Sequence, residues 1–593
     1  MHSDTIQAGR ERREAIFVAA AAVLAVALAS LPLFGEGNMH VADDIWYHLL
    51  RIENIRAGLE AGQFPVRMGT NYLNHYGYGS NLCYPELFLY IPAVLRLLGM
   101  SVTGSYKAFI ILTNAGAFAA MYYAAKYLTG QRLVGLAAAV LLLLSPYHLA
   151  NIYLRGALGE VQTYMFYPLV AVGLYQLVYE DFDKPWVLGL GFWGLMYSHS
   201  ISLVLGLLAS VGICLVHFKR VFLNARKVRR VFATAGVTLA ASCSFWLPFM
   251  EQLLSGNLKF DTPWTYVSWQ GVSWQRLFSV QQDRYNFGLP FLALSAAALV
   301  MLIVWRRKIR GAGEKDAEAA EKTGLARKGI FCLVSGAALL FCATQYFPWA
   351  VVEPVLNNIQ FPWRFYALAS VFLALGIGAA VYAAGRKKRI FLYGGVLLVC
   401  AVAVGGAGLY LRRNPVDYVD LPYDGGYSNP DGTFEIIQRE WLPAQVDFDS
   451  LRGERQVRTE EGESVPFQTD ARGFITFEAD GEHTSYLVPF IWYKGYTAVL
   501  MTANGEKELE ATADEATGLV RVSLGAGEAG TVRCGYGGTA LQRISDIAEG
   551  ITILALAGGL LVNWHKNNRR KADRRIENHE SMDETGRGAV SEI

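Results

Sequence analysis

Three side chains able to move a proton or bind an anion recur at helical spacing in the stretch HVADDIWYHLLRIENIRAGLE. Asp44, His48 and Arg51 are spaced i, i+4 and i+7, so on a helix they would share one face beside an apolar stripe. Such a helix would lie at a membrane surface and present an acid, an imidazole and a guanidinium. An amphipathic interfacial helix with ordinary surface charges has the same spacing, and the pattern alone leaves both interpretations open.

Four further ionisable residues stand at the predicted ends of apolar segments, at or near one mouth of the bundle. They are Arg155, Glu160, His199 and Arg364. A charge in or beside a membrane helix is costly and is by default a candidate functional residue. Each has a structural alternative: an Arg155–Glu160 pair, a satisfied core histidine at His199, and an interfacial arginine beside Trp363. Their convergence on one face predicts an outward-facing polar cavity.

The elements that must position these residues are membrane helices. The chain has 593 residues, of which 53% are hydrophobic and 18% charged, whereas a soluble domain carries about 25% charge. Apolar runs of about 17 to 25 residues are long enough to cross a ~30 Å hydrocarbon core. The net charge of +2 gives no basic field for nucleic acid. Seven cysteines without a CxxC motif indicate neither a disulfide framework nor a zinc site.

Basic clusters predict which loops are cytoplasmic. These clusters lie at 10–13, 219–230, 306–310 with 322–328, 386–389 and 566–575. Alternation between them predicts about twelve crossings, with both termini in the cytoplasm. The chain is outside after residue 34 and in the cytoplasm at residue 219, so an odd number of crossings must lie between, and one of the six apolar runs there cannot cross. The short run 86–99, which contains Pro92 and Arg96, is expected to be re-entrant or interfacial.

The expected crossings are 16–34, 104–128, 131–150, 161–180, 185–200, 201–218, 229–250, 288–306, 329–347, 364–385, 390–411 and 546–564. The first of them could be a cleaved signal peptide, but it is long for one and is expected to be a retained helix.

Three regions follow from this topology. Residues 1–411 form a transmembrane body whose first external loop, 35–103, carries juxtamembrane helices. Residues 412–545 contain short alternating stretches such as FITFEA and YTAVLM between turns, which predict an extracytoplasmic β-sandwich-like module. Its run YLVPFIWYKGY supplies either sheet core or a carbohydrate platform. Residues 546–593 form the last transmembrane helix and a basic cytoplasmic tail.

Five motifs occur in an order that resembles bacterial membrane proteins of the YfhO-like and 6-pyruvoyl-tetrahydropterin synthase-related families. They are DDIWYHLLRI, YPELFLYIP, SPYHLANIYLRGALGE, QFPWRF and YLVPFIWYKGYTA. Both groups are similar to the GT-C glycosyltransferase superfamily, and the likeness covers residues 10 to 565. It implies a GT-C-like polytopic α-helical fold with an essential acidic residue in the first external loop. By motif position that role falls on Asp44, with Asp43 directly before it as the alternative.

The resemblance implies a membrane glycosyltransferase that moves a sugar from a polyprenyl-phosphate donor to a cell-envelope glycan, lipid or protein. The reaction would take place on the extracytoplasmic face of the bacterial plasma membrane and invert the anomeric centre. Asp44 is expected to be the general base, with His48 orienting it or binding the acceptor. Arginine suits a phosphate because its planar fork donates two hydrogen bonds at once. The expected substrate-binding residues are Asp43, Arg51, Arg155, Glu160, His199, Trp363 and Arg364.

Two other questions stay open on the sequence. No cofactor is required by this chemistry, although magnesium or manganese held by Asp44 and Glu160 is an alternative. A transporter or flippase of a lipid-linked glycan would instead need ionisable residues or broken helices near mid-membrane, and a non-catalytic scaffold would need neither. Because the predicted spans are almost free of charge at mid-depth, the sequence favours the transferase.

Overall fold

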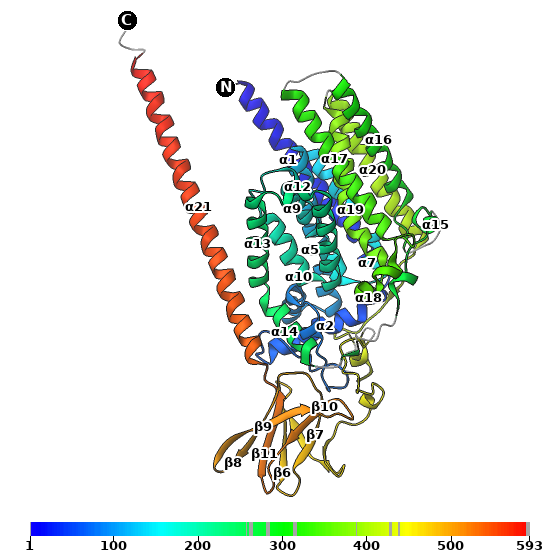
Figure 1. Ribbon diagram of the computed structural model, residues 1–593, viewed down its shortest axis with the longest axis vertical. Coiled ribbons are helices and arrows are strands. Elements are labelled where there is room, and N and C mark those ends of the chain that lie inside the picture. The colour runs from blue at the N-terminus through cyan, green and yellow to red at the C-terminus, as the bar shows by residue number, and fades with distance from the viewer. Residues whose placement is uncertain are drawn as a thin grey trace.

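The computed structural model describes residues 2–255, 258–259, 265–279, 285–311, 317–386, 388–425, 430–436 and 439–588. Figure 1 shows a helical bundle with a smaller β-rich module at one end of the long axis. The N-terminal helix α1 and the C-terminal part of α21 lie toward the opposite end. The fold is therefore a polytopic α-helical body with a β module before the last helix, as the sequence predicts.

Seven helices in the described chain are long and apolar enough to cross a membrane. They are α1 (His2–Ser30), α5 (Val102–Thr129), α16 (Leu289–Gly311), α17 (Ala317–Cys342), α19 (Phe365–Gly385), α20 (Arg389–Arg413) and α21 (Ala540–Gly588). Two bent pairs qualify when each is taken as one span: α6 (Arg132–Leu143) with α7 (Pro146–Tyr153), bent by 47°, and α13 (Ala225–Ala240) with α14 (Cys243–Ser255), bent by 76°.

The three remaining expected crossings correspond to shorter helices. They are α9 (Tyr167–Tyr179), α10 (Trp186–Ser198) and α11 (Ser200–Val216), of 13, 13 and 17 residues. A helix needs about 20 residues to cross a bilayer unaided. Length and composition thus give seven to nine spans in the described residues, where the charge pattern predicts about twelve. The difference lies in α9–α11, whose ends are interrupted by irregular backbone.

The run 86–99 forms η2 (Leu87–Leu89) and the short helix α4 (Tyr90–Leu97). Eight residues at ~1.5 Å each span only about 12 Å, too little to cross the hydrocarbon core. Arg96 of α4 forms an ion pair with Glu53 of α2 (Ile45–Glu60). The two helices therefore pack together in the first loop, as expected for a run that does not cross.

The β module is a nine-stranded antiparallel sheet in the described residues, in the order β4-β3-β7-β10-β9-β8-β11-β6-β5. The strands are β3 (Val457–Thr459), β4 (Ser464–Val465), β5 (Phe467–Thr469), β6 (Ile475–Asp480), β7 (Ser485–Ile491), β8 (Tyr496–Thr502), β9 (Gly505–Ala513), β10 (Leu519–Ser523) and β11 (Ala529–Tyr536). Strand β9 pairs with β10 on one side and with β8 on the other, so it joins two halves of the sheet. The halves share one core, in which the ring of Phe477 on β6 lies 5.0 Å from that of Tyr486 on β7. The sheet folds over itself like a sandwich, and α21 begins at Ala540, before the predicted boundary at 546.

Strand pairing and a shared hydrophobic cluster join the module to the first loop. Strand β1 (Met39–His40) pairs with β2 (Tyr418–Val419), just after α20. Tyr72 and Tyr78, which follow α2, are buried in the same hydrophobic cluster as Tyr493 of the module. The module therefore shares a core with the loop that carries the candidate acid.

The remaining helical segments are short. They are α3 (Ser80–Cys83), α8 (Leu158–Thr163), α12 (Phe218–Val221), α15 (Trp274–Leu277), α18 (Trp349–Leu356), η1 (Leu31–Phe34), η4 (Val267–Trp269), η5 (Asn357–Ile359), η6 (Pro362–Arg364), η7 (Pro430–Phe434) and η8 (Ser450–Arg452). In Figure 1, α2, α14 and α18 lie at the end of the bundle beside the β module.

Candidate functional site

Asp44 stands directly before the first turn of α2, not inside the helix. Its backbone N–H donates a 2.8 Å hydrogen bond to the carbonyl of Arg155, in the turn between α7 and α8. Gly156 in this turn has a φ of 62°, and a Cβ there would lie 3.1 Å from the backbone nitrogen of Ile45. A larger residue would be strained and would push the turn away from α2. The motif RGALGE therefore brings Asp44 and Arg155 together.

Glu160 is the centre of a buried hydrogen-bonded cluster. Its Oε1 accepts bonds from Nη2 of Arg155 (2.9 Å) and Nε of Arg364 (2.8 Å), and its Oε2 accepts one from the hydroxyl of Tyr147 (2.9 Å). The Glu160 side chain is 3% exposed. Burial opposes ionisation, but the two guanidinium groups outweigh it and hold the pKa of Glu160 far below its ordinary value. Glu160 is therefore ionised, and its oxygens are engaged.

The two arginines of this cluster have further partners. Nη1 of Arg155 donates to Asn151 Oδ1 at 2.6 Å, and Nη1 of Arg364 donates to Gln360 Oε1 at 3.0 Å. Both side chains are 8% exposed. One carboxylate shared by two guanidinium groups leaves one positive charge in excess within these three residues, and the nearby Asp44 carboxylate offsets it when ionised. The cluster is therefore suited to attract an anion.

The carboxylate of Asp44 differs from that of Glu160. It is partly buried, and within the described chain it accepts no hydrogen bond. Burial raises the pKa of Asp44 to about 6; Arg155 and Arg364 offset part of the rise, and the neighbouring Asp43 adds to it. A carboxylate without a hydrogen-bond donor whose pKa lies near neutrality has the properties that a general base needs. Asp43 itself is exposed.

His48 and Arg51 are bonded to each other and not to the Asp44 side chain. His48 Nδ1 lies 2.9 Å from Nη1 of Arg51, and His48 Nε2 lies 3.3 Å from the backbone nitrogen of Leu158. Burial lowers the pKa of His48 well below its ordinary value, and the charge of Arg51 adds to the effect. The shared face expected for the three residues forms only in part, because Asp44 precedes the helix.

Arg51 is 1% exposed and has all its nitrogens engaged. Besides His48, it donates from Nε to Glu86 Oε1 (2.8 Å) and from Nη2 to the carbonyl of Pro85 (2.7 Å). Its guanidinium carbon lies 4.2 Å from the ring centroid of Tyr84. Arg51 therefore ties α2 to residues 84–86. Its partner Glu86 lies in the YPELFLYIP motif, but nothing in the sequence pairs the two residues.

His199 and Trp363, two further predicted site residues, lie just before the starts of α11 and α19. His199 precedes α11, where its Nδ1 accepts a bond from the backbone N–H of Ser202 at 3.2 Å. The ring of Trp363 stacks on those of Tyr285 and Phe361, each at 4.4 Å between centroids. The indole Nε1 of Trp363 is buried and has no hydrogen-bond partner in the described chain.

A cavity of about 420 Å³ lies beside this cluster. Its polar side includes Tyr84, His199 and Gln360, and Gln360 bonds to Arg364. Most of its apolar lining comes from α11, α14 and α18 and includes Ile201, Val204, Phe249, Leu253, Val355 and Leu356. Val355 is 83% exposed, so the apolar side opens to the outer surface of the bundle. The cavity thus joins a polar wall to a surface that lipid would cover.

Gln360 has a positive φ of 62° although it is not a glycine. Its Oε1 accepts from Arg364, and its Nε2 donates to Glu440 Oε1 at 2.7 Å. Strained backbone held by its surroundings is concentrated at functional sites. Gln360 belongs to the QFPWRF motif, but an uncharged glutamine gives no sign of a functional site in the sequence. The same holds for Tyr147 and Asn151.

No group of three or more histidine, cysteine, aspartate or glutamate side chains that could hold a metal ion occurs in the part of the chain that the structure describes. Of the expected pair, Glu160 already accepts three hydrogen bonds, whereas Asp44 accepts none from the described residues. A shared metal would have to displace at least one donor from Glu160.

Comparison with known proteins identifies relatives of the membrane body. The family model for the 6-pyruvoyl-tetrahydropterin synthase related domain, a membrane protein, matches residues 83–411. An uncharacterized protein of Lactococcus lactis subsp. cremoris (strain MG1363) is 22% identical over 284 residues, which are 44% of this chain and 45% of that protein.

Three solved structures are similar at low identity. The arabinofuranosyltransferase AftD from Mycobacteria has a TM-score of 0.40 at 15% identity, over 66% of this chain and 26% of that one. The oligosaccharyltransferase of Archaeoglobus fulgidus with zinc and sulfate has a TM-score of 0.39 at 16% identity, over 68% and 53%. The Archaeoglobus fulgidus oligosaccharyltransferase AglB with an inhibitory peptide and a dolichol-phosphate has a TM-score of 0.38 at 14% identity, over 78% and 62%. This chain spans less than two thirds of the length of each relative.

Proposed function

The chain belongs to the membrane-protein family described as 6-pyruvoyl-tetrahydropterin synthase related, and from this premise we propose that it is a membrane glycosyltransferase. It transfers a sugar from a polyprenyl-phosphate donor to a cell-envelope acceptor at the extracytoplasmic face of the bacterial plasma membrane. The observation that carries the proposal is the partly buried Asp44 carboxylate, which accepts no hydrogen bond in the described chain while two guanidinium groups lie nearby. The GT-C-like motifs agree with it.

The donor is lipid-linked because nucleotide sugars are not available outside the cytoplasmic membrane. The cavity of about 420 Å³ suits such a donor, with apolar side chains for the prenyl chain and Gln360 and Arg364 near the phosphate. The excess positive charge of the Arg155–Glu160–Arg364 cluster would stabilise the phosphate as its bond to the sugar breaks.

Asp44 is the general base in this proposal. The acceptor hydroxyl attacks the anomeric carbon and its proton passes to the Asp44 carboxylate. The bond from the anomeric carbon to the phosphate oxygen breaks, and polyprenyl phosphate leaves with the electron pair. A single displacement of this kind inverts the anomeric centre, and general-base catalysis contributes typically about 10²–10⁴-fold.

The other residues position or surround Asp44 and the two arginines. Glu160 fixes the two arginines, and Arg51 and His48 hold α2 in place. His199 lines the donor cavity, Trp363 adjoins Arg364 in the QFPWRF motif, and Asp43 remains the alternative base. We propose that no divalent metal is required, since the oxygens of Glu160 are engaged by protein donors. Transfer that persists in excess EDTA would support this, and loss restored by magnesium or manganese would refute it.

A lipid-linked glycan flippase is the second candidate, and the bent pairs α6–α7 and α13–α14 favour it, because transporters use broken helices. Detergent micelles have no two leaflets, so a flippase produces no chemical change in them. The purified chain should be incubated in micelles with a polyprenyl-phosphate sugar and envelope glycan, and the products identified by mass spectrometry. Sugar-extended glycan with free polyprenyl phosphate supports the transferase, whereas an intact donor supports the flippase or a scaffold.

A further inference from the structure

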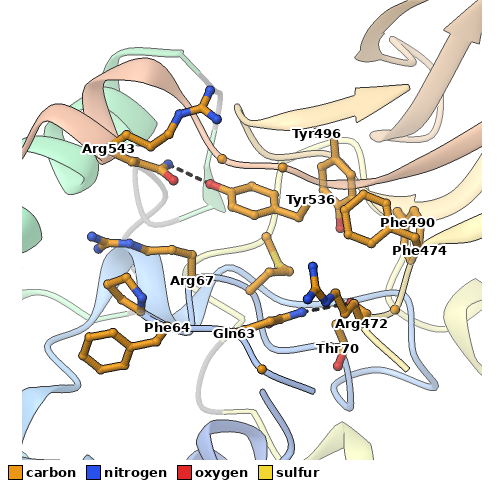
Figure 2. Close-up of a pocket in the computed structure, with 18 of the residues that line it drawn as sticks. Gln63, Phe64, Arg67, Thr70, Arg472, Phe474, Phe490, Tyr496, Tyr536 and Arg543 are labelled. Atoms are coloured by element: carbon orange, nitrogen blue, oxygen red, sulfur yellow. Dashed lines mark hydrogen bonds between the residues drawn. The ribbon is translucent and has the colours of Figure 1, made fainter. Parts of the chain in front are cut away.

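A second cavity, of about 360 Å³, lies between the loop after α2, the β module and the start of α21. In Figure 2 the rings of Phe474, Phe490, Tyr496 and Tyr536 lie on the side of the module, and Gln63, Phe64 and Arg67 lie across from them. Three segments far apart in sequence line this cavity, so no single sequence motif predicts it.

The module side of the cavity is lined by aromatic side chains, of which Phe490 and Tyr496 are buried and Tyr536 is partly exposed. Phe490 and Tyr496 stack with centroids 5.3 Å apart, and Tyr536 meets Tyr496 edge-on at 5.4 Å. The hydroxyl of Tyr536 is held by a 2.7 Å bond from Gln542 Nε2, drawn in Figure 2. At the rim, Phe64 is 79% exposed. Aromatic faces of this kind suit the apolar faces of sugar rings.

The polar lining of the cavity is positively charged. Arg67 forms an ion pair with Asp546, yet its Nε is buried without a hydrogen-bond partner in the described chain. The guanidinium groups of Arg472 and Arg543 have no acidic partner among the described residues. Burial lowers the pKa of His75, which leaves it neutral near pH 7. Two positive charges are therefore in excess, and they suit an acidic ligand.

The wall facing the module is strained. Leu73, Asn74 and His75 all have positive φ values, between 51° and 65°, although none is a glycine. The module holds this segment, since the backbone N–H of Leu73 donates to the carbonyl of Thr433 at 2.9 Å. Gly473 opposite has a φ of 82°, and a Cβ there would lie 2.8 Å from Thr70 Cγ2. Gly473 adopts this conformation without strain because it has no Cβ, so the non-glycine outliers lie on one side, where His75 lines the cavity.

The position of the cavity sets the size of its ligand. Asp44 precedes α2, and the lining begins at Gly62, just beyond the other end of this 16-residue helix. At ~1.5 Å per residue the helix separates the two sites by about 24 Å. A monosaccharide held in this cavity could not reach Asp44. A ligand that serves both sites must be an extended chain.

We propose that this cavity binds an anionic glycan chain, with sugar rings against the tyrosine and phenylalanine rings and acid groups paired with Arg472 and Arg543. Identifying this chain as the acceptor of the transfer reaction rests on the proposed function. The binding site itself does not, because it lies apart from Asp44 and shares no residue with the cluster at Glu160.

The test measures binding to the purified full-length chain in detergent by titration calorimetry, with a galacturonate hexasaccharide as the probe. The fully methyl-esterified hexasaccharide is the matched ligand, since it keeps the sugar rings and loses the charges. We expect the acid to bind at least about tenfold more tightly than the ester, with an affinity that falls as salt rises. Equal binding of acid and ester, or no binding of either, would overturn the proposal.

The double variant Arg472→Gln/Arg543→Gln should bind the acid about tenfold or more weakly, with an unchanged melting temperature because both side chains are exposed. Lys507→Gln removes a charge from a module residue that does not line the cavity and should bind as the wild type does. A double variant with wild-type affinity would contradict the assignment. Complete displacement of the hexasaccharide by phosphatidylglycerol vesicles would instead identify a lipid headgroup site.

The Asp44→Asn variant separates this inference from the proposed function. It should bind the hexasaccharide as the wild type does, because Asp44 does not line the cavity. If no transfer is found in any preparation but binding still depends on Arg472 and Arg543, the glycan site stands and the transferase proposal fails. If transfer occurs while the hexasaccharide does not bind, the transferase stands and this site fails.

Discussion

Nε of Arg364 donates a 2.8 Å hydrogen bond to Oε1 of Glu160, which lies 204 residues earlier in the chain. This bond joins the residue that precedes α19 to the short helix α8, and Arg155 donates to the same oxygen of Glu160. The geometry of the proposed phosphate site therefore depends on one carboxylate that touches no part of the cavity lined by Gln360.

Glu160→Gln should destabilise the protein strongly. The substitution leaves Arg155 and Arg364 buried around a neutral amide, and breaking a buried ion pair on one side costs about 3–5 kcal/mol. Glu60→Gln is the matched control, because Glu60 forms a pair with Arg56 that is half exposed and contributes only about 0–1 kcal/mol. Melting temperatures in detergent compare them, and equal shifts would show that the cluster is not a structural centre.

Arg51→Lys should also be costly although it keeps the charge. A lysine cannot donate to Glu86, Pro85 and His48 at once, and it loses the planar contact with Tyr84. We expect a clear fall in melting temperature, with transfer reduced in parallel as α2 loosens. Arg56→Lys on the same helix, with a side chain 25% exposed, should change neither. A stable Arg51→Lys variant with lost transfer would assign Arg51 a direct substrate contact instead.

Arg364→Gln should weaken donor binding and slow the reaction together. A charge-assisted contact to phosphate contributes about 1.5–3 kcal/mol, so KM for the donor should rise by roughly tenfold or more. The KM for the acceptor should stay unchanged, which a general loss of structure would not allow. Arg364→Lys should recover part of the rate through its charge. A donor KM equal to that of the wild type would remove Arg364 from the phosphate site.

Much of the fold follows from composition and charge. Apolar runs and basic clusters locate the helices, and parity shows that the run at α4 does not cross. Alternation locates the β module, and Arg155 and Glu160 of the motif RGALGE lie in one buried polar cluster. The number of spans is less certain from sequence, because α9–α11 are shorter than the apolar runs that contain them.

The contacts of the site could not be predicted in the same way. Helical spacing placed Asp44, His48 and Arg51 on one face, but Asp44 is the residue before the helix, and Arg51 turns to Glu86. Pairings over long separations depend on tertiary packing, which spacing does not report. The sequence also could not tell which residues of the run YLVPFIWYKGY lie only in the sheet core. Tyr493 and Tyr496 are both buried, but only Tyr496 also lines the second cavity.

Transfer should increase with pH through an acid limb near pH 6. Burial raises the pKa of Asp44 to about 6, and only the ionised carboxylate can accept the proton of the acceptor. Because this pKa lies above the ordinary value of about 3.9, the folded state loses stability as Asp44 ionises with rising pH. A kcat/KM profile of the wild type measures the limb. A flat profile from pH 5 to 8 would contradict the role of Asp44.

The most direct measurement is the transfer rate of Asp44→Asn beside Asp43→Asn, with a purified polyprenyl-phosphate sugar and envelope acceptor. Asn keeps the shape of Asp44 but cannot take a proton, so transfer should fall by about 10² or more while donor binding remains. Its melting temperature at pH 7 should not fall, because the substitution removes a partly buried charge. Asp43→Asn, at an exposed position, should be milder. Near-normal transfer by Asp44→Asn would contradict the account, and abolition by Asp43→Asn alone would move the base by one residue.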